Sequence, residues 1–228
     1  MSQPSVKVVY CYPIIGDAQY LDLALRFLKT YHEYPAGFPH ESLVVCNGGE
    51  PNDEVEFMFG AMENVRLMHH DNSGRDIGAF QHAARDNPCD LMLFFGATAY
   101  IRGAGWLARV VESWMKRGDT LYGVMGNRGV ISHGVHPHIR TTGMWISPAL
   151  FNQYPYKVTD PSHRYPFEHG PECLTGWITR RGKIPYVVSW SGEWNWNYWD
   201  SFPRGWHRGD QGYMIFGDRM SCPPYHPC

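Results

Sequence analysis

The segment Asn72-Ser73-Gly74-Arg75-Asp76-Ile77-Gly78-Ala79-Phe80 stands between a strand-like run, Val65 to Met68, and a pattern of apolar residues spaced as on one helical face. A loop that follows the carboxyl end of a strand and opens a helix is where open α/β sheets bind ligands. We expect Gly74 and Gly78 to let the backbone approach a bulky anionic ligand, with free N–H groups of the helix start facing a phosphate.

Two charged side chains in this segment add to that expectation. Arg75 offers a fixed cation, and Asp76 offers an acceptor for a hydroxyl or an amide. The alternative is a plain turn and a capped helix, in which Asp76 serves only the first helical turn.

Length and composition indicate one globular domain. A chain of 228 residues can bury a full hydrophobic core, and 43% apolar with 18% charged residues is ordinary for such a domain. The net charge of −2 gives no reason to expect nucleic acid as a partner, and no apolar run reaches membrane-spanning length. The six cysteines are scattered without a C-x-x-C pair, so we expect a cytoplasmic protein without a disulfide framework.

Strands and helices are predicted to alternate as far as Gly118. Strand-like runs lie at 6–12, 42–46, 65–68 and 90–95, and helical patterns follow them, the first capped by Asp17 and the last covering 106–115. This alternation predicts a mainly parallel sheet. Beyond it, strands are predicted at 121–125, 143–147 and 186–189 and a helix at 173–181, whereas 190–228 shows little periodicity.

Four segments, in this order, resemble one known family. Residues 72–80 are similar to an N-x-G-x-D-x-G-A motif, 90–106 to a segment that carries a metal-binding D-x-D, 142–147 to a strand behind an acceptor site, and 168–182 to a region with a catalytic carboxylate. Together they resemble the GT-A fold of nucleotide-sugar-dependent glycosyltransferases, in particular the family-2-like and rhamnan-synthesis-type branches.

The resemblance implies an α/β fold with a Rossmann-like, mainly parallel central sheet flanked by helices and an irregular, aromatic-rich C-terminal segment. It divides the single domain 1–228 into a nucleotide-binding half, 1–118, and an acceptor-binding half, 119–228. The implied activity is transfer of a sugar from a UDP, GDP or dTDP donor to a hydroxyl of an oligosaccharide or glycan acceptor.

The chain departs from the family at two places. Gly96-Ala97-Thr98 stands where D-x-D is usual, and Asn47 stands where an acidic residue usually reads the base. The Mn²⁺ or Mg²⁺ of the family is therefore either absent or held by other groups, of which His207 is a weak candidate. Fixed cations can stabilise the same phosphate charge, and the candidates are Arg75, Arg102, His207 and Arg208.

Donor-binding residues are expected at the ends of the first strands and in the segment 72–80. Tyr12 could equally be an ordinary core aromatic. The candidates are Tyr10, Tyr12, Pro13, Asn47, Asn72, Gly74, Arg75, Asp76, Thr98 and Arg102.

A carboxylate must remove the proton of the acceptor hydroxyl, and direct attack would then invert the anomeric carbon. The resemblance points to Glu172 first and Glu168 second, with Asp160 and Glu193 in reserve. The alternative for Glu172 is an interaction with the dipole of the helix that follows.

Tryptophans are expected to bind the acceptor, since sugar C–H faces pack on indole rings. Trp194, Trp196 and Tyr198 would share one side of a strand, although the same rings could instead form a lid on the sheet. The acceptor candidates are Trp145, Trp194, Trp196 and Trp199.

Two other functions compete with transfer. The missing D-x-D favours a non-catalytic carbohydrate- or nucleotide-binding domain of the same fold. A zinc hydrolase is the weaker alternative, and its ligands would come from His133, His136, His138, His163 and His169.

Overall fold

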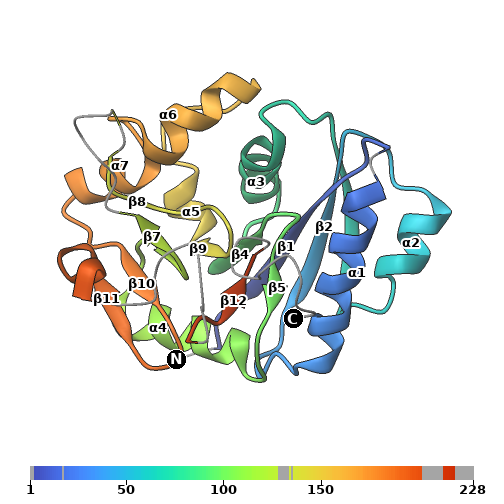
Figure 1. The fold of residues 1–228 in the computed structure, drawn as a ribbon, viewed down its shortest axis with the longest axis horizontal. Coiled ribbons are helices and arrows are strands. Elements are labelled where there is room, and N and C mark those ends of the chain that lie inside the picture. The colour runs from blue at the N-terminus through green and yellow to red at the C-terminus, as the bar shows by residue number, and fades with distance from the viewer. Residues whose placement is uncertain (1–2, 17, 128–133, 135, 202–212, 219–228) are drawn as a thin grey trace.

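The first half of the chain alternates strands with helices in the computed structural model, which describes residues 3–16, 18–127, 134, 136–201 and 213–218 (Figure 1). Its elements are β1 (Val6–Pro13), α1 (Ala18–Glu33), β2 (Glu41–Asn47), α2 (Asp53–Phe59), β3 (Val65–His70), α3 (Arg75–Asp86), β4 (Leu91–Phe95), β5 (Tyr100–Ile101) and α4 (Trp106–Arg117). The four strands and four helices predicted here are confirmed, while Asp17 lies outside the described residues.

The second half is built from shorter pieces. Its elements are β6 (Tyr122–Gly123), β7 (Gly126–Asn127), β8 (His138–Ile139), β9 (Met144–Ile146), α5 (Pro148–Phe151), η2 (Pro161–His163), α6 (Arg164–His169), α7 (Leu174–Arg180), β10 (Tyr186–Val188), β11 (Glu193–Asn195), η3 (Trp196–Ser201) and β12 (Phe216–Gly217). The predicted strand 121–125 is shorter than expected, because the chain leaves the sheet after β6 and β7 pairs with β8. Regular structure also occurs beyond residue 190, where β11 pairs with β10 and β12 with β5, in pairings too short to leave a periodic pattern.

One sheet of eight strands runs through the molecule in the order β11-β10-β6-β9-β4-β1-β2-β3. Strands β3, β2, β1 and β4 are mutually parallel, whereas β9 is antiparallel to both of its neighbours, β4 and β6. This mainly parallel α/β sheet with flanking helices is the predicted fold class.

Apolar side chains cover both faces of the sheet, as expected for strands buried on two sides. Successive residues of β4 point to opposite faces: Leu93 and Phe95 join one core cluster, and Met92 and Phe94 join the other. Side chains of α1, α2 and α4 complete the first cluster, and those of α3, α5, α6 and α7 complete the second. The helices therefore form a layer on each face and leave the carboxyl ends of the parallel strands to the loops.

No helix in the described ranges combines the length and the apolar character needed to cross a bilayer.

Candidate functional site

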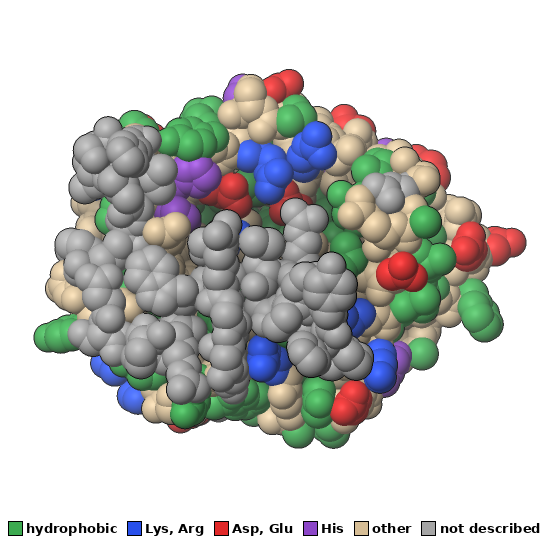
Figure 2. Space-filling model, viewed as in Figure 1, with side chains coloured by type: hydrophobic (Ala, Val, Ile, Leu, Met, Phe, Trp, Pro, Cys, Tyr) green, Lys and Arg blue, Asp and Glu red, His purple; other side chains and the backbone are tan. Residues whose placement is uncertain are grey.

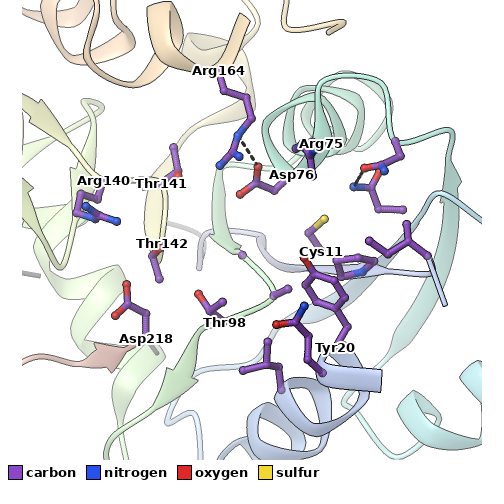
Figure 3. Close-up of a pocket in the computed structure, with 18 of the residues that line it drawn as sticks. Cys11, Tyr20, Arg75, Asp76, Thr98, Arg140, Thr141, Thr142, Arg164 and Asp218 are labelled. Atoms are coloured by element: carbon purple, nitrogen blue, oxygen red, sulfur yellow. Dashed lines mark hydrogen bonds and ion pairs between the residues drawn. The ribbon is translucent and has the colours of Figure 1, made fainter. Parts of the chain in front are cut away.

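A cavity of about 410 Å³ opens at the carboxyl ends of β1, β2 and β4 (Figure 3). The starts of α1 and α3, the helix α6, and the segment between β8 and β9 border it. On the surface, Arg, Lys, Asp and Glu side chains gather around a hollow at the upper middle of the face shown in Figure 2. The lining residues are Cys11, Pro13, Ile15, Gln19, Tyr20, Leu23, Asn47, Asn72, Arg75, Asp76, Gly96, Ala97, Thr98, Arg140, Thr141, Thr142, Arg164, Glu168 and Asp218.

The segment 72–76 reaches the cavity through a left-handed backbone. Asn72, Gly74 and Arg75 have φ values of 67°, 71° and 56°. A Cβ on Gly74 would lie 2.1 Å from the carbonyl oxygen of Val158, so this glycine is required by a close approach of the chain to itself. Gly74 does not line the cavity, and the expectation that it makes room for a ligand stays a prediction.

Asparagine side chains join the ends of β2 and β3. The Nδ2 of Asn47 donates to the Oδ1 of Asn72 over 2.8 Å, and the Oδ1 of Asn47 lies 2.7 Å from the Nδ1 of His70. The backbone N–H of Asn72 points at the same His70 nitrogen over 3.2 Å. Burial lowers the pKa of His70, and its Nδ1 can bond either the Asn47 oxygen as a donor or the Asn72 N–H as an acceptor, according to the tautomer. The position where an acidic residue was expected thus presents a fixed amide.

Charged side chains face one another across the cavity. The Oδ1 of Asp76 lies 3.2 Å from the Nε of Arg164, and the Oγ1 of Thr141 donates to the Oε1 of Glu168 over 2.8 Å. Arg164 and Glu168 are four residues apart on α6 and so share one face of that helix. Burial raises the pKa of the Asp76 carboxyl, against the opposing effect of Arg164.

The segment after β4 contributes backbone and one hydroxyl to the site. The hydroxyl of Tyr10 donates to the Ala97 carbonyl over 3.0 Å, and the Nη2 of Arg26 donates to the Thr98 carbonyl over 2.8 Å. A Cβ on Gly96 would lie 3.7 Å from the Oδ2 of Asp76, so Asp76 brings its carboxylate to the end of β4 from another element.

Six predicted donor residues line the cavity, namely Pro13, Asn47, Asn72, Arg75, Asp76 and Thr98. Three more do not, for reasons of packing. Tyr10 is fully buried and stacks on Phe27 with ring centroids 4.1 Å apart, Tyr12 packs edge-on against Phe59, and Arg102 lies over the ring of Tyr100. None of these three side chains lines the cavity, and their part in donor binding stays a prediction.

The candidate bases lie in different parts of the structure. Glu168 lines the cavity, whereas Glu172 is exposed and its Oε2 lies 2.6 Å from the Nη2 of Arg180. Asp160 caps the short helix η2, and the Glu193 carboxylate is 1% exposed among three basic side chains. Glu168, the second choice from the sequence, is therefore the one candidate base that lines the cavity.

Of the predicted acceptor tryptophans, Trp145, Trp194 and Trp199 do not line the cavity. Trp145 is fully buried and stacks on Tyr122 with an interplanar angle of 2°. Trp199 is 5% exposed, and its Nε1 donates to the backbone oxygen of the half-buried Trp194. The strand β11 ends at Asn195, so it displays no row of rings; the side chain of Trp196 lies outside the described residues.

The histidines do not form the expected zinc site in the part of the chain that is described. His138 and His169 lie with ring centroids 5.2 Å apart, but the Nδ1 of His138 is 2.7 Å from the carbonyl of His136. Within these residues no group of three His, Cys, Asp or Glu side chains is placed to share an ion. His133, His207 and Arg208 lie outside the described residues.

Three charged residues that line the cavity escaped prediction, namely Arg140, Arg164 and Asp218. Arg140 follows β8 directly, and its Nε is buried without a hydrogen-bond partner among the described residues. Their only signal in the sequence was a position beside a short element. Nothing local tied residues so far apart along the chain to segment 72–76.

Comparisons with known proteins bear on the fold. No protein-family model matches the chain, and no curated protein matches it. The mannosyltransferase PcManGT from Pyrobaculum calidifontis, in complex with GDP-Man and Mn²⁺, is 14% identical with a TM-score of 0.50, over 71% of this chain and 51% of that one. A putative glucose-1-phosphate thymidylyltransferase from Bacillus anthracis, in complex with a sucrose, is 12% identical with a TM-score of 0.53, over 78% and 85%.

The chain thus spans about half the length of the mannosyltransferase and most of the thymidylyltransferase. At these identities the likeness shows the fold alone, a Rossmann-like GT-A arrangement that glycosyltransferases and nucleotidyltransferases share. The predicted fold is confirmed.

Proposed function

We propose that this chain transfers a sugar from a nucleotide-sugar donor to a hydroxyl of a glycan acceptor. The observation that carries the proposal is the cavity itself, in which Asp76, Arg164 and Glu168 meet the Asn47–Asn72 pair at the carboxyl edge of a GT-A sheet. Ligands of open α/β sheets bind at this edge. The rhamnan-synthesis-type branch, the acceptor half 119–228 and the cytoplasmic location stay predictions.

The donor would enter along β1 and β2. Pro13 and Ile15 offer an apolar wall for a base, and the amide of Asn47 lies at its edge. Asp76 lies farther in, where its carboxyl would accept from a hydroxyl of the ribose or of the sugar. UDP, GDP and dTDP donors all suit this arrangement.

Glu168 is the proposed base. Its carboxylate would take the proton of the acceptor hydroxyl while that oxygen bonds to the anomeric carbon and the nucleoside diphosphate leaves with the electrons of the broken bond. The hydrogen bond from Thr141 fixes one carboxylate oxygen and leaves the other for the acceptor. Attack from the side opposite the leaving group inverts the anomeric carbon.

A divalent ion, as the mannosyltransferase is described to hold, does not fit the residues of this site. Residues 96–98 carry no carboxylate, and in the described part of the chain no three His, Cys, Asp or Glu side chains are placed to share an ion. Mn²⁺ and Mg²⁺ require several oxygen ligands with free lone pairs. We therefore assign no step to a metal.

The second candidate is a binding domain that holds sugar nucleotides without transferring them, which the missing carboxylate after β4 favours. Calorimetry with UDP-, GDP- and dTDP-sugars, followed by an assay of nucleoside diphosphate release with an acceptor, separates the two. Transfer predicts binding and release.

The variant Glu168→Gln should keep donor affinity within about twofold and slow release by about 10²-fold or more. Its matched control is Glu172→Gln, which removes a carboxylate four residues away that lies outside the cavity and should leave release unchanged. Donor binding without release in the wild-type chain would leave only the binding domain. A larger loss in Glu172→Gln than in Glu168→Gln would reverse the choice of base.

A further inference from the structure

The cavity gathers basic side chains from three separate elements. Arg75 stands at the start of α3, Arg140 lies between β8 and β9, and Arg164 is the first residue of α6. Figure 3 shows Arg140 and Arg164 pointing into the cavity from different walls. A ligand there would meet guanidinium groups from several directions, a geometry that suits the oxygens of a diphosphate.

From this we infer that the diphosphate of the donor is bound directly by Arg75, Arg140 and Arg164, with no divalent ion between the phosphates and the protein. The inference rests on the proposed function, because it presumes that a nucleotide sugar is the ligand. It departs from the metal-bridged arrangement that the resemblance implies.

Arg140 gives the inference its strongest support. Its Nε is buried and has no hydrogen-bond partner among the described residues. A buried donor without a partner destabilises a folded protein, so most such groups are paired. Its backbone N–H is bonded to the Met125 carbonyl over 3.0 Å, which anchors the residue at the cavity wall. Because the Nε is shielded from solvent, a phosphate would be bound through the part of the guanidinium that lines the cavity.

Arg164 forms an ion pair but no hydrogen bond through its Nε. Its Nε lies 3.2 Å from the Oδ1 of Asp76, and neither atom has a hydrogen bond of good geometry. Phosphate oxygens would compete for the guanidinium, and the Asp76 carboxyl would turn to a ligand hydroxyl. Arg102, a basic group considered from the sequence, lies over Tyr100, and the neighbouring Arg26 donates to the Thr98 carbonyl.

The carboxylates that line the cavity are not placed as the ligands of one metal ion. Asp76 and Glu168 have the partners described above, and Asp218, which is 2% exposed, also has a partner and lies in the field of Arg26. The three carboxylates come from α3, α6 and the residue after β12, and they do not form a group that shares one ion. The arginines are thus the groups best placed to neutralise phosphate charge.

Calorimetry on the full chain tests the inference, with UDP, GDP and dTDP titrated separately in EDTA and in excess Mn²⁺. We expect the preferred diphosphate to bind in EDTA with a Kd within about twofold of its value in Mn²⁺, since no ion takes part. Arg140→Gln should weaken that binding by about tenfold or more, and it should weaken the nucleoside monophosphate less than the diphosphate. Arg140→Lys keeps the charge and should lose less.

Arg85→Gln is the matched control, because Arg85 is 65% exposed at the far end of α3 and bonded to Asp86. It removes the same charge outside the cavity and should change the Kd by less than about twofold. Circular dichroism checks the fold of each variant. If Arg140→Gln does not fold, Arg75→Gln makes the same test with an exposed side chain.

The outcomes separate the inference from the proposed function. If the diphosphate binds only in Mn²⁺, or if its Kd in EDTA is unchanged by substitution of Arg75, Arg140 and Arg164, the inference is overturned and the proposed function stands. No binding of any nucleotide in either buffer removes the proposed function itself.

Discussion

Gly74 and Gly105 form a natural pair for a test of the loop that opens the cavity. Each precedes a long helix in a left-handed conformation, with φ 71° and ψ 9° at Gly74 and φ 76° and ψ 14° at Gly105. They differ in surroundings: a Cβ on Gly105 would meet nothing within 4 Å, whereas one on Gly74 would lie 2.1 Å from the Val158 oxygen.

Gly105→Ala should therefore report the left-handed backbone alone, about 1–2 kcal/mol of lost stability. Gly74→Ala carries the same penalty, and the Val158 carbonyl must in addition retreat by about 0.9 Å in a close-packed region. That segment cannot yield easily, since the Val158 N–H donates to Gln81 of α3 over 3.0 Å. Overpacking of this kind adds about 1–3 kcal/mol, so Gly74→Ala should lose about 2–5 kcal/mol in all.

Urea unfolding followed by tryptophan fluorescence measures both variants. The reasoning predicts a difference of at least about 1 kcal/mol between the free energies of unfolding of the two variants. Equal losses, within about 0.5 kcal/mol, would refute the claim that contact with Val158 is what requires glycine at position 74.

Three further predictions concern the packing behind the site. Glu193→Gln should lower the free energy of unfolding by about 2 kcal/mol, since its buried carboxylate has Arg117 at 2.7 Å among three cations. Burial acts to raise the pKa of Glu193, but the basic partners outweigh burial and lower it, so the stabilisation is present above about pH 5 and lost in acid. Urea titrations of the wild-type chain from pH 3 to 7 would show this loss, and a flat profile would contradict it. Burial lowers the pKa of His138 to about 4, so the unfolded chain binds more protons than the folded one below about pH 6.5. The free energy of unfolding should therefore rise as the pH goes from about 4 to 6.5. His138→Gln should flatten that rise, and an unchanged slope would contradict the role given to His138. Trp145→Leu should lower the free energy of unfolding by about 3 kcal/mol through the cavity left beside Tyr122, while acceptor affinity, measured by calorimetry, stays the same. Weaker acceptor binding in a folded variant would show that Trp145 takes part in binding the acceptor.

Local patterns were enough to predict the framework. The continuous apolar run of β4 and the 3.6-residue spacing of α4 are properties of a few neighbouring residues, so they survive without knowledge of the rest of the chain. The position of segment 72–76 was predictable for the same reason, because a strand directly before it and a helix directly after it place it at the carboxyl edge of the sheet.

The choice between Glu168 and Glu172 could not be made from the sequence. They are only four residues apart, but Glu168 lies on α6, whereas Glu172 follows the end of that helix and turns to Arg180. Where α6 ends decides which carboxylate faces the cavity, and helix ends are the least certain feature of a sequence pattern.

By itself, the sequence determined a mainly parallel α/β sheet, the order of elements in its first half and one loop at the carboxyl edge of that sheet, because these depend on the periodicity of adjacent residues. Tertiary structure alone decided that Arg140, Arg164 and Asp218 join Arg75 and Asp76 at one cavity. They meet because β9 pairs antiparallel with both β4 and β6, which places elements of the second half of the chain beside those of the first. Contacts between residues so far apart depend on how the elements pack, and no local pattern records them.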